Sequence, residues 1–144
     1  MKIYIGSDHR GFELKERLKN IFLSKEPSII FEDIGTNDRE PCDYPVIIEK
    51  LASIFEEKDK AIVICGSGIG MSIAANRYKH IRGALCFNEI IVKLARKHNN
   101  ANMLILGADF IDDDNAIKFI QIFLNTEFEG GRHANRLELI DKMR

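Results

Sequence analysis

Residues 61–77, AIVICGSGIGMSIAANR, constrain the fold of this 144-residue chain more than any other stretch. Residues 61–64 form a short apolar run typical of a strand, residues 66–70 form a glycine-rich turn, and a helical pattern begins near Met71. Such a turn binds anions, because unpaired backbone N–H groups point outward and the helix dipole favours negative charge. Cys65 lies at the mouth of the turn, where the same field favours a thiolate. The stretch therefore predicts an anionic ligand facing an activated sulfur.

Apolar strand-like runs alternate with helical patterns along the rest of the chain. The predicted strands are residues 2–6, 28–34, 60–64, 83–87 and 103–107. The predicted helices are residues 12–24, 45–57, 89–98, about 112–124 and 132–142, together with the one that follows the glycine turn. This alternation predicts one α/β domain over residues 1–144, with a parallel sheet covered by helices on both faces. Ligands of such folds bind beyond the carboxyl ends of the strands where the strand order reverses, which selects the loops after the first and third strands.

Charge and cysteine content exclude several classes of protein. The formal net charge of −1 provides no basic field for nucleic acid, and no apolar run approaches the length of a membrane span. The first residues, MKIYIGSDH, do not fit a signal peptide. The three cysteines, Cys42, Cys65 and Cys86, lack paired spacing. We therefore expect free thiols in a reducing cytoplasm, and neither a disulfide framework nor a CxxC metal site.

The glycine turn differs from the common phosphate-binding loops. Gly66-x-Gly68-x-Gly70 has neither the dinucleotide GxGxxG spacing nor the GK[ST] ending of a P-loop. One alternative is a tight turn that only needs glycines for its shape, but the adjacent cysteine favours a functional site. Cys65 could also be an ordinary buried thiol, and Ser67 could cap the helix instead of passing a proton.

Asp8 and His9 occupy the other loop of the predicted switch point. Asp8 could simply cap the next helix, whereas a carboxylate beside an imidazole at this position favours contact with a ligand. His98 lies four residues after Leu94 and eight after Ile90, which predicts that it shares their buried face. A core histidine and a ligand-binding histidine are both open alternatives there.

Arg132 and Arg136 lie one turn apart on the last predicted helix and project together. Two forked guanidinium groups suit a phosphate. The alternative is a solvated face in which these arginines pair with Glu129 or Glu138.

Five segments resemble the type B ribose-5-phosphate isomerases, in order and over essentially the whole chain. They are GSDHRGFELK, DYP, ICGSGIGMSIAAN, RKHNNANML and EGGRHANR. The resemblance implies an aldose–ketose isomerase that interconverts ribose 5-phosphate and ribulose 5-phosphate in the non-oxidative pentose phosphate pathway. It implies a Rossmann-like α/β/α sandwich with strand order 2-1-3-4-5. It also implies a homodimer or homotetramer with the active site between subunits, no cofactor, and a C-terminal helix of about residues 131–144 packed on a partner.

The resemblance also implies roles for individual residues. Cys65 would be the base that moves a proton between C1 and C2, and Ser67, where many members have threonine, would help move one between O1 and O2. His98 would open the sugar ring. Ile69 stands where one branch of the family has a glutamate base, so the chain resembles the cysteine branch. The resemblance further implies that the backbone of Gly66, Gly68, Ile69 and Gly70 contacts the enediolate. Asp8, Tyr44 and Asn99 would hold hydroxyls. His9, Arg132 and Arg136 would bind the phosphate, and His133 is a weaker candidate for that role.

Three alternatives stay open from the sequence. The substrate could be the six-carbon allose 6-phosphate or galactose 6-phosphate, because residue spacing does not give the depth of a cavity. The chain could be a non-catalytic sugar-phosphate sensor on the same fold. It could also be a cysteine hydrolase using Cys65 with His98, which would form a covalent intermediate.

Overall fold

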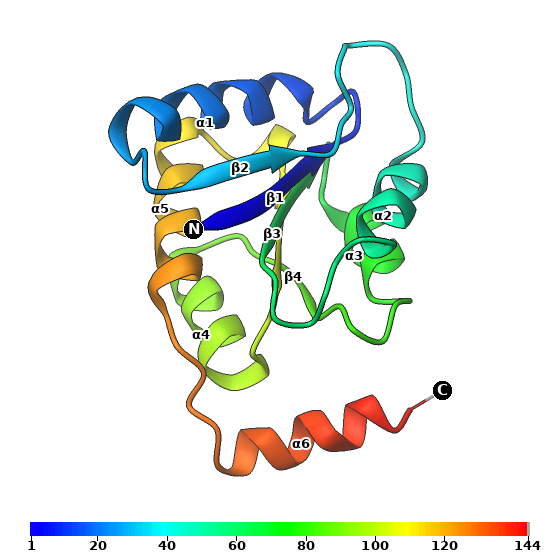
Figure 1. Ribbon diagram of the computed structural model, residues 1–144, viewed down its shortest axis with the longest axis vertical. Coiled ribbons are helices and arrows are strands. Elements are labelled where there is room, and N and C mark those ends of the chain that lie inside the picture. Colours follow the sequence, from blue (N-terminus) through cyan, green and yellow to red (C-terminus); the bar gives the residue numbers. More distant parts are fainter. Residues whose placement is uncertain (144) are drawn as a thin grey trace.

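A parallel five-stranded sheet forms the middle of three layers in the computed structural model, which describes residues 1–143 (Figure 1). The strands are β1 (Lys2–Ser7), β2 (Ile30–Asp33), β3 (Ala61–Cys65), β4 (Gly83–Leu85) and β5 (Met103–Gly107). One face is covered by α1 (Phe12–Lys25), α4 (Glu89–Asn99) and α5 (Asp113–Asn125), and the other by α2 (Tyr44–Ala52) and α3 (Ile69–Ala75). A single-turn 3₁₀ helix (Ala108–Phe110) follows β5, and α6 (Arg132–Asp141) packs beside α4. The predicted α/β/α class is confirmed.

The strand order is β2-β1-β3-β5-β4, so the predicted order 2-1-3-4-5 is wrong at its last two positions. All five residues of β5 are buried, and β5 pairs with β3 over its full length. The three residues of β4 are only partly buried. A continuous apolar strand belongs in the centre of a parallel sheet, and a short, half-exposed one belongs at its edge. The reversal of winding between β1 and β3 stays where it was predicted.

Several element boundaries differ from the expectations. Helix α3 begins at Ile69, two residues earlier than predicted, because Gly68 takes a left-handed conformation (φ +81°) that ends the turn. Helix α2 ends at Ala52, well before the expected residue 57, and β2 and β4 are shorter than expected. Arg144, the last residue of the predicted C-terminal segment, lies outside the described residues.

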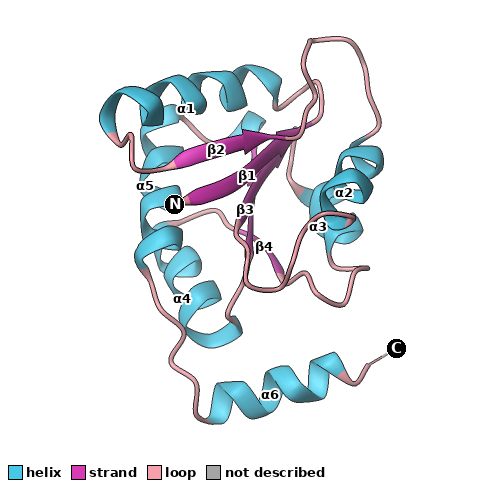
Figure 2. Cartoon of the chain, in the orientation of Figure 1, coloured by secondary structure: helices cyan, strands magenta, loops and turns pink. Residues whose placement is uncertain are grey.

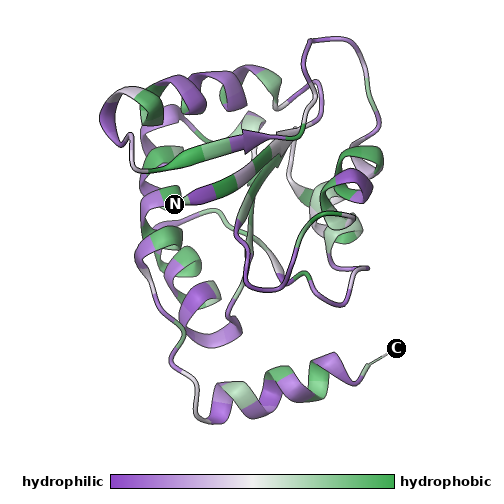
Figure 3. Ribbon diagram, in the orientation of Figure 1, coloured by the Kyte–Doolittle hydropathy of each residue, from purple (hydrophilic) through white to green (hydrophobic). Residues whose placement is uncertain are grey.

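Two separate cores hold the layers together, one on each face of the sheet. Ile62 and Ile64 of β3 face the core beneath α1, α4 and α5, while Val63 faces the one beneath α2 and α3. This alternation follows the period of two of a strand, and Figure 3 shows the hydrophobic strand residues enclosed between the helices. Because β3 is buried on both faces, it fixes the position of Cys65 at its end.

The loop of residues 34–43 is the longest connection near the carboxyl ends of the strands, and Figure 2 shows it extending past β1 and β2. The fully buried ammonium of Lys15 anchors its start, donating to Asp33 Oδ1 at 2.7 Å and to the Thr36 carbonyl at 2.6 Å. Among residues 1–143, none of the helices combines the length and apolar character needed to cross a bilayer.

Candidate active site

The thiol of Cys65 lies at the bottom of the glycine turn, with only 4% of the residue exposed. The Gly68 N–H donates to Cys65 Sγ at 3.1 Å, and the Ile69 N–H donates to Ser67 Oγ at 3.2 Å. A hydrogen bond from a backbone N–H favours the charged form of a sulfur. The turn therefore brings the predicted base and the predicted hydroxyl together, with main-chain donors directed at both.

Close main-chain packing holds the turn in place. A methyl group added to Gly107, at the end of β5, would lie 2.5 Å from the Ser67 carbonyl oxygen. One added to Gly11, just before α1, would lie 2.5 Å from the Ile64 carbonyl oxygen. Both contacts are far shorter than any real carbon–oxygen packing distance, so the two neighbouring loops can approach β3 and its turn only as glycines.

Asp8 and His9 lie at the same edge of the sheet as Cys65. Asp8 is buried, and its Oδ1 accepts the N–H groups of Arg10 (2.9 Å) and Gly11 (3.1 Å), so it orders the approach to α1. His9 Nδ1 accepts the Cys42 N–H at 3.2 Å. Because Nδ1 is an acceptor there, the proton of the neutral ring lies on Nε2, which is left as a donor.

Tyr44 joins this group from the start of α2. A methyl group on Gly70 would lie 2.5 Å from Tyr44 Cζ, so the tyrosine ring lies directly against the glycine turn. The exposed side chain of Ile69 is next to this contact and carries no group that can accept a proton. The structure thus brings together Asp8, Tyr44 and the turn around Cys65 at one edge of the sheet.

Two residues that the sequence did not single out also lie against the turn. Arg10 forms an ion pair with Asp109, and its guanidinium lies over Gly66. Arg10 follows His9 in a loop already identified, so its position could have been anticipated. Asp109 follows β5. The predicted strand order did not place β5 beside β3, so Asp109 was not expected near the glycine turn.

The remaining predicted site residues lie away from the glycine turn; they are His98, Asn99, Arg132 and Arg136. Helix α4 runs antiparallel to the strands, so its last residues, His98 and Asn99, lie at the edge where the strands begin (Figure 1). Three residues after Asn99, the Asn102 carbonyl accepts the N–H of Ala61, the first residue of β3. Cys65 is at the opposite end of that strand. Within one chain, the predicted site is therefore divided between the two edges of the sheet.

The face of α4 that carries His98 is not the buried one, which corrects the prediction. Ile90 is 70% exposed and Leu94 is 37% exposed, whereas Val92 and Ala95 face the core. His98 is only half-buried, and its cover comes from His133 of α6, whose ring stacks on it. A helix whose apolar residues exceed one stripe leaves part of them uncovered, and periodicity alone cannot say which part.

Both arginines of α6 are exposed, and within residues 1–143 neither forms an ion pair with a carboxylate. Glu129, the alternative partner, instead pairs with Lys97 at 3.3 Å and faces His133 Nε2 at 3.7 Å. The guanidinium groups of Arg132 and Arg136 are therefore available to an anion.

His98, Glu129 and His133 present donor atoms within 4.8 Å of one another, as a metal site would. The two imidazole rings, however, stack with centroids 4.1 Å apart and planes only 12° from parallel. An imidazole nitrogen binds a metal in the plane of its ring, so two parallel rings direct their lone pairs side by side instead of at one ion. This geometry favours a histidine stack over a metal centre.

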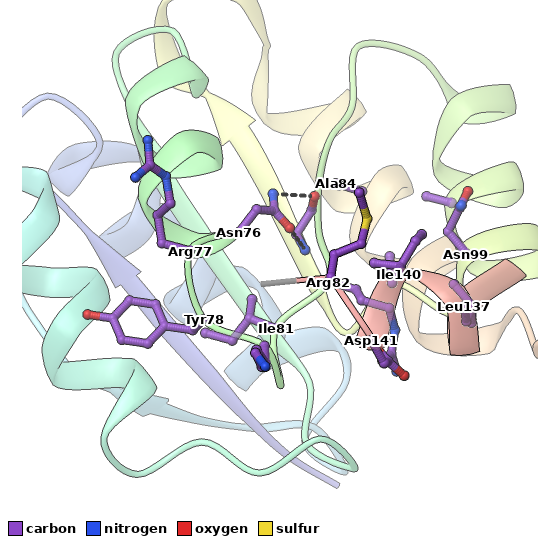
Figure 4. A pocket seen from close by; sticks show the side chains of 15 residues that line it. Asn76, Arg77, Tyr78, Ile81, Arg82, Ala84, Asn99, Leu137, Ile140 and Asp141 are labelled. Carbon is purple, nitrogen blue, oxygen red and sulfur yellow. Dashed lines mark hydrogen bonds between the residues drawn. The ribbon is translucent and has the colours of Figure 1, made fainter.

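A cavity of about 610 Å³ lies beneath α6, away from the glycine turn (Figure 4). Leu137 and Ile140 of α6 line one side, residues 76–79 and 81–84 line another, and Asn99 contributes from the end of α4. The cavity therefore contains one predicted site residue and lacks the thiol.

The other two cysteines differ from Cys65 in their surroundings. Burial raises the pKa of the Cys86 thiol to about 12, and Cys42 is half-buried in the loop that contacts His9. Neither receives a backbone N–H on its sulfur among the described residues.

Comparison with known proteins agrees with the fold and with the motifs. The sequence profile of the Ribose/Galactose Isomerase family matches residues 3–140. A ribose 5-phosphate isomerase crystal structure from Thermotoga maritima is 46% identical and superposes with a TM-score of 0.88, covering 99% of this chain and 98% of that one.

Two further relatives extend the comparison. Ribose-5-phosphate isomerase B of Escherichia coli K12 is 36% identical over 141 residues, which cover 96% of this chain and 93% of the relative. A Mycoplasma genitalium ribose-5-phosphate isomerase B, crystallised with bound ribulose 5-phosphate, is 37% identical with a TM-score of 0.87, covering 98% of this chain and 94% of that one.

Proposed function

The chain belongs to the ribose/galactose isomerase family, and from this premise we propose that it interconverts ribose 5-phosphate and ribulose 5-phosphate with Cys65 as the base. The observation that carries the proposal is the hydrogen bond from the Gly68 N–H to Cys65 Sγ, in a turn whose main chain faces the reacting groups. Removing a proton next to a carbonyl requires a base of suitable pKa and donors that stabilise the developing oxyanion.

In the proposed reaction the Cys65 thiolate removes the proton from C2 of the open-chain aldose. The electron pair moves between C1 and C2, and the negative charge that forms on O1 is stabilised by the main chain of the turn. The Ser67 hydroxyl carries the proton from O2 to O1. The thiol then returns its proton to C1, which yields the ketose and regenerates the thiolate.

The donors of the turn are not equivalent in this scheme. The N–H groups of Gly68 and Ile69 are already directed at Cys65 and Ser67, so they stabilise the catalytic groups. The N–H groups of Gly66 and Gly70 are better suited to the substrate oxyanion, because the first turn of a helix and the loop before it leave donors unpaired.

We propose that His98 opens the ring and that Asp8, Tyr44 and Asn99 hold hydroxyls. The Nε2 donor of His9 and the guanidinium groups of Arg132 and Arg136 would then bind the phosphate, which supplies remote binding energy for orientation. His133 is assigned here to support of His98, on which it stacks.

The site is complete only between two copies of the chain. Cys65 lies where the strands end and His98 lies where they begin, so a second subunit must bring His98 and the α6 arginines to the glycine turn. Exposed apolar residues flank the edge strand β4 on both sides and suit such an interface; they are Ile69, Ile73, Phe87, Ile90 and Leu94. We therefore propose a homodimer, or a homotetramer built from it, acting as a single-domain enzyme in the cytoplasm.

The six-carbon substrates are the alternative within the family, whose profile covers galactose isomerases as well. The ribulose 5-phosphate bound by the Mycoplasma genitalium protein favours the five-carbon sugar. The scheme uses no metal or organic cofactor.

The decisive experiment mixes the purified full chain with ribose 5-phosphate in the presence of a chelator and follows ribulose 5-phosphate. Cys65→Ala should lower turnover by roughly 10²–10⁴-fold while the fold survives, and Cys86→Ala is the matched cysteine control. Allose 6-phosphate and galactose 6-phosphate are assayed in parallel, and faster turnover of either would reassign the substrate. No turnover by a folded oligomer would favour a sugar-phosphate sensor instead.

A further inference from the structure

The ion pair between Arg10 and Asp109 closes one side of the glycine turn. Both side chains are partly exposed, at 58% and 42%. A methyl group added to Gly66 would lie 2.8 Å from Arg10 Nε and 3.2 Å from Arg10 Cζ, so the guanidinium lies against the residue that follows Cys65. Arg10 is thus a cationic group of the same chain placed directly at the mouth of the thiol site.

Both members of the pair are positioned by main-chain contacts with the turn or its surroundings. The Arg10 N–H donates to Asp8 Oδ1, which fixes the backbone that carries the guanidinium. The Asp109 N–H donates to the Gly66 carbonyl at 3.0 Å, which attaches the carboxylate to the turn itself. A flexible surface pair would lack these constraints, because its side chains would start from unrelated segments.

Comparison with another ion pair in the chain shows what is unusual here. Arg17 and Asp113 form a second ion pair of similar exposure, 51% and 35%, but it connects α1 to α5 over the outer surface. Arg10 instead contacts the turn that carries Cys65, and its neighbour in sequence is His9. The position of Arg10, more than its charge alone, therefore points to a ligand.

We propose that Arg10 is a phosphate-binding residue of this isomerase, and that Asp109 holds its guanidinium over Gly66 until the substrate enters. The proposal rests on the sugar-phosphate function argued above. The phosphate is the anionic part of such a substrate, and a guanidinium fork binds it through two parallel charge-assisted hydrogen bonds. Arg10 would thereby supply a cation from the same subunit as Cys65, to complement the arginines of α6 that come from the other edge.

The test compares Arg10→Ala and Arg10→Lys with Arg17→Ala, which removes a surface pair of similar exposure away from the turn. Two quantities are measured for each folded variant: the KM for ribose 5-phosphate and the dissociation constant of inorganic phosphate. Loss of a charge-assisted contact should raise both by about tenfold or more in Arg10→Ala, with kcat changed much less. Arg10→Lys should recover part of the loss because it keeps the charge without the fork, and Arg17→Ala should match the wild type.

Unchanged phosphate binding in Arg10→Ala would overturn the proposal, as would a fall in kcat with KM and phosphate binding unchanged. Binding of inorganic phosphate is read without turnover. A chain that binds phosphate through Arg10 but does not isomerise ribose 5-phosphate would therefore refute the proposed function and leave the Arg10 assignment standing.

Discussion

The imidazole rings of His98 and His133 stack face to face, with centroids 4.1 Å apart and planes 12° from parallel. The stack joins the end of α4 to the first turn of α6, and His133 is 5% exposed, with no hydrogen-bond partner for its Nε2 among the described residues. His98 is the residue proposed to open the sugar ring, and the stack fixes the orientation of its imidazole.

The stack predicts an acid-dependent loss of stability. Burial lowers the pKa of His133 below its ordinary value of 6.5, and the nearby charges of His98, Arg132 and Arg136 lower it further against the opposing effect of Glu129. As the pH falls below 6.5 the unfolded chain binds the proton first, so the free energy of unfolding decreases with decreasing pH. Thermal melts from pH 7.5 to 5.5 should show this decrease, and part of it should be absent in His133→Gln, which cannot titrate. Parallel curves for the two proteins would contradict the assignment.

Alkylation should distinguish the Cys65 thiol from the Cys86 thiol. Cys65 receives a hydrogen bond from the Gly68 N–H, whereas burial raises the pKa of Cys86 to about 12. Iodoacetamide at pH 7.5 should therefore modify Cys65 well before Cys86, and ribose 5-phosphate should slow the modification of Cys65. Peptide mass spectrometry over a time course measures both rates, with Cys65→Ala to identify the peptide. Modification of Cys86 first, or no protection by substrate, would count against Cys65 as the base.

Gly107→Ala should displace the glycine turn. The added methyl group would meet the Ser67 carbonyl oxygen at 2.5 Å, and the nearest atoms are all main chain of Ser67, which leaves little room for adjustment. Because catalytic groups must be held within fractions of an ångström, we expect kcat to fall by about tenfold or more. Gly83→Ala is the control, since Gly83 lies where β4 begins and its methyl group would come closest to the flexible end of the Ile105 side chain, at 2.8 Å. Equal kcat values for the two variants would show that the turn tolerates the shift.

Mixed oligomers should reveal whether the site is shared between subunits. Cys65→Ala lacks the proposed base and Arg136→Ala lacks a proposed phosphate ligand, so each is expected to be poorly active alone at low substrate concentration. If the two residues act in one site from different subunits, a refolded equimolar mixture contains dimers with one intact site and recovers about a quarter of the wild-type activity. No recovery in dimers shown to exchange subunits would place both residues in the same chain's site.

The sequence predicted the main features of the fold because they depend on local patterns. The apolar run before Cys65 and the glycines after it are both local signals, as is the alternation of strand and helix patterns along the chain. They were enough to define the sheet, the turn and the group of residues around the thiol.

Long-range relationships were the part that local patterns could not supply. Strand order depends on which neighbour buries β5 best, and the error there hid Asp109 from the site. The exposure of Ile90 and Leu94 depends on what packs on α4, so the buried face of that helix was misassigned. The stack on His98 requires α6 to return to α4 through the glycines at 130 and 131, which no helical period encodes.

Cys65 and His98 are separated by the whole length of β3, and this separation bears on the protein concentration at which any activity is expected. If the site forms between two copies, as proposed above, a lone chain carries two halves of different sites and no complete one. Specific activity would then depend on total protein concentration. Dilution that dissociates the oligomer into single chains should abolish turnover while leaving each chain folded. A newly synthesised chain would become an enzyme only on meeting a second copy, so assembly itself would be the step that switches on turnover.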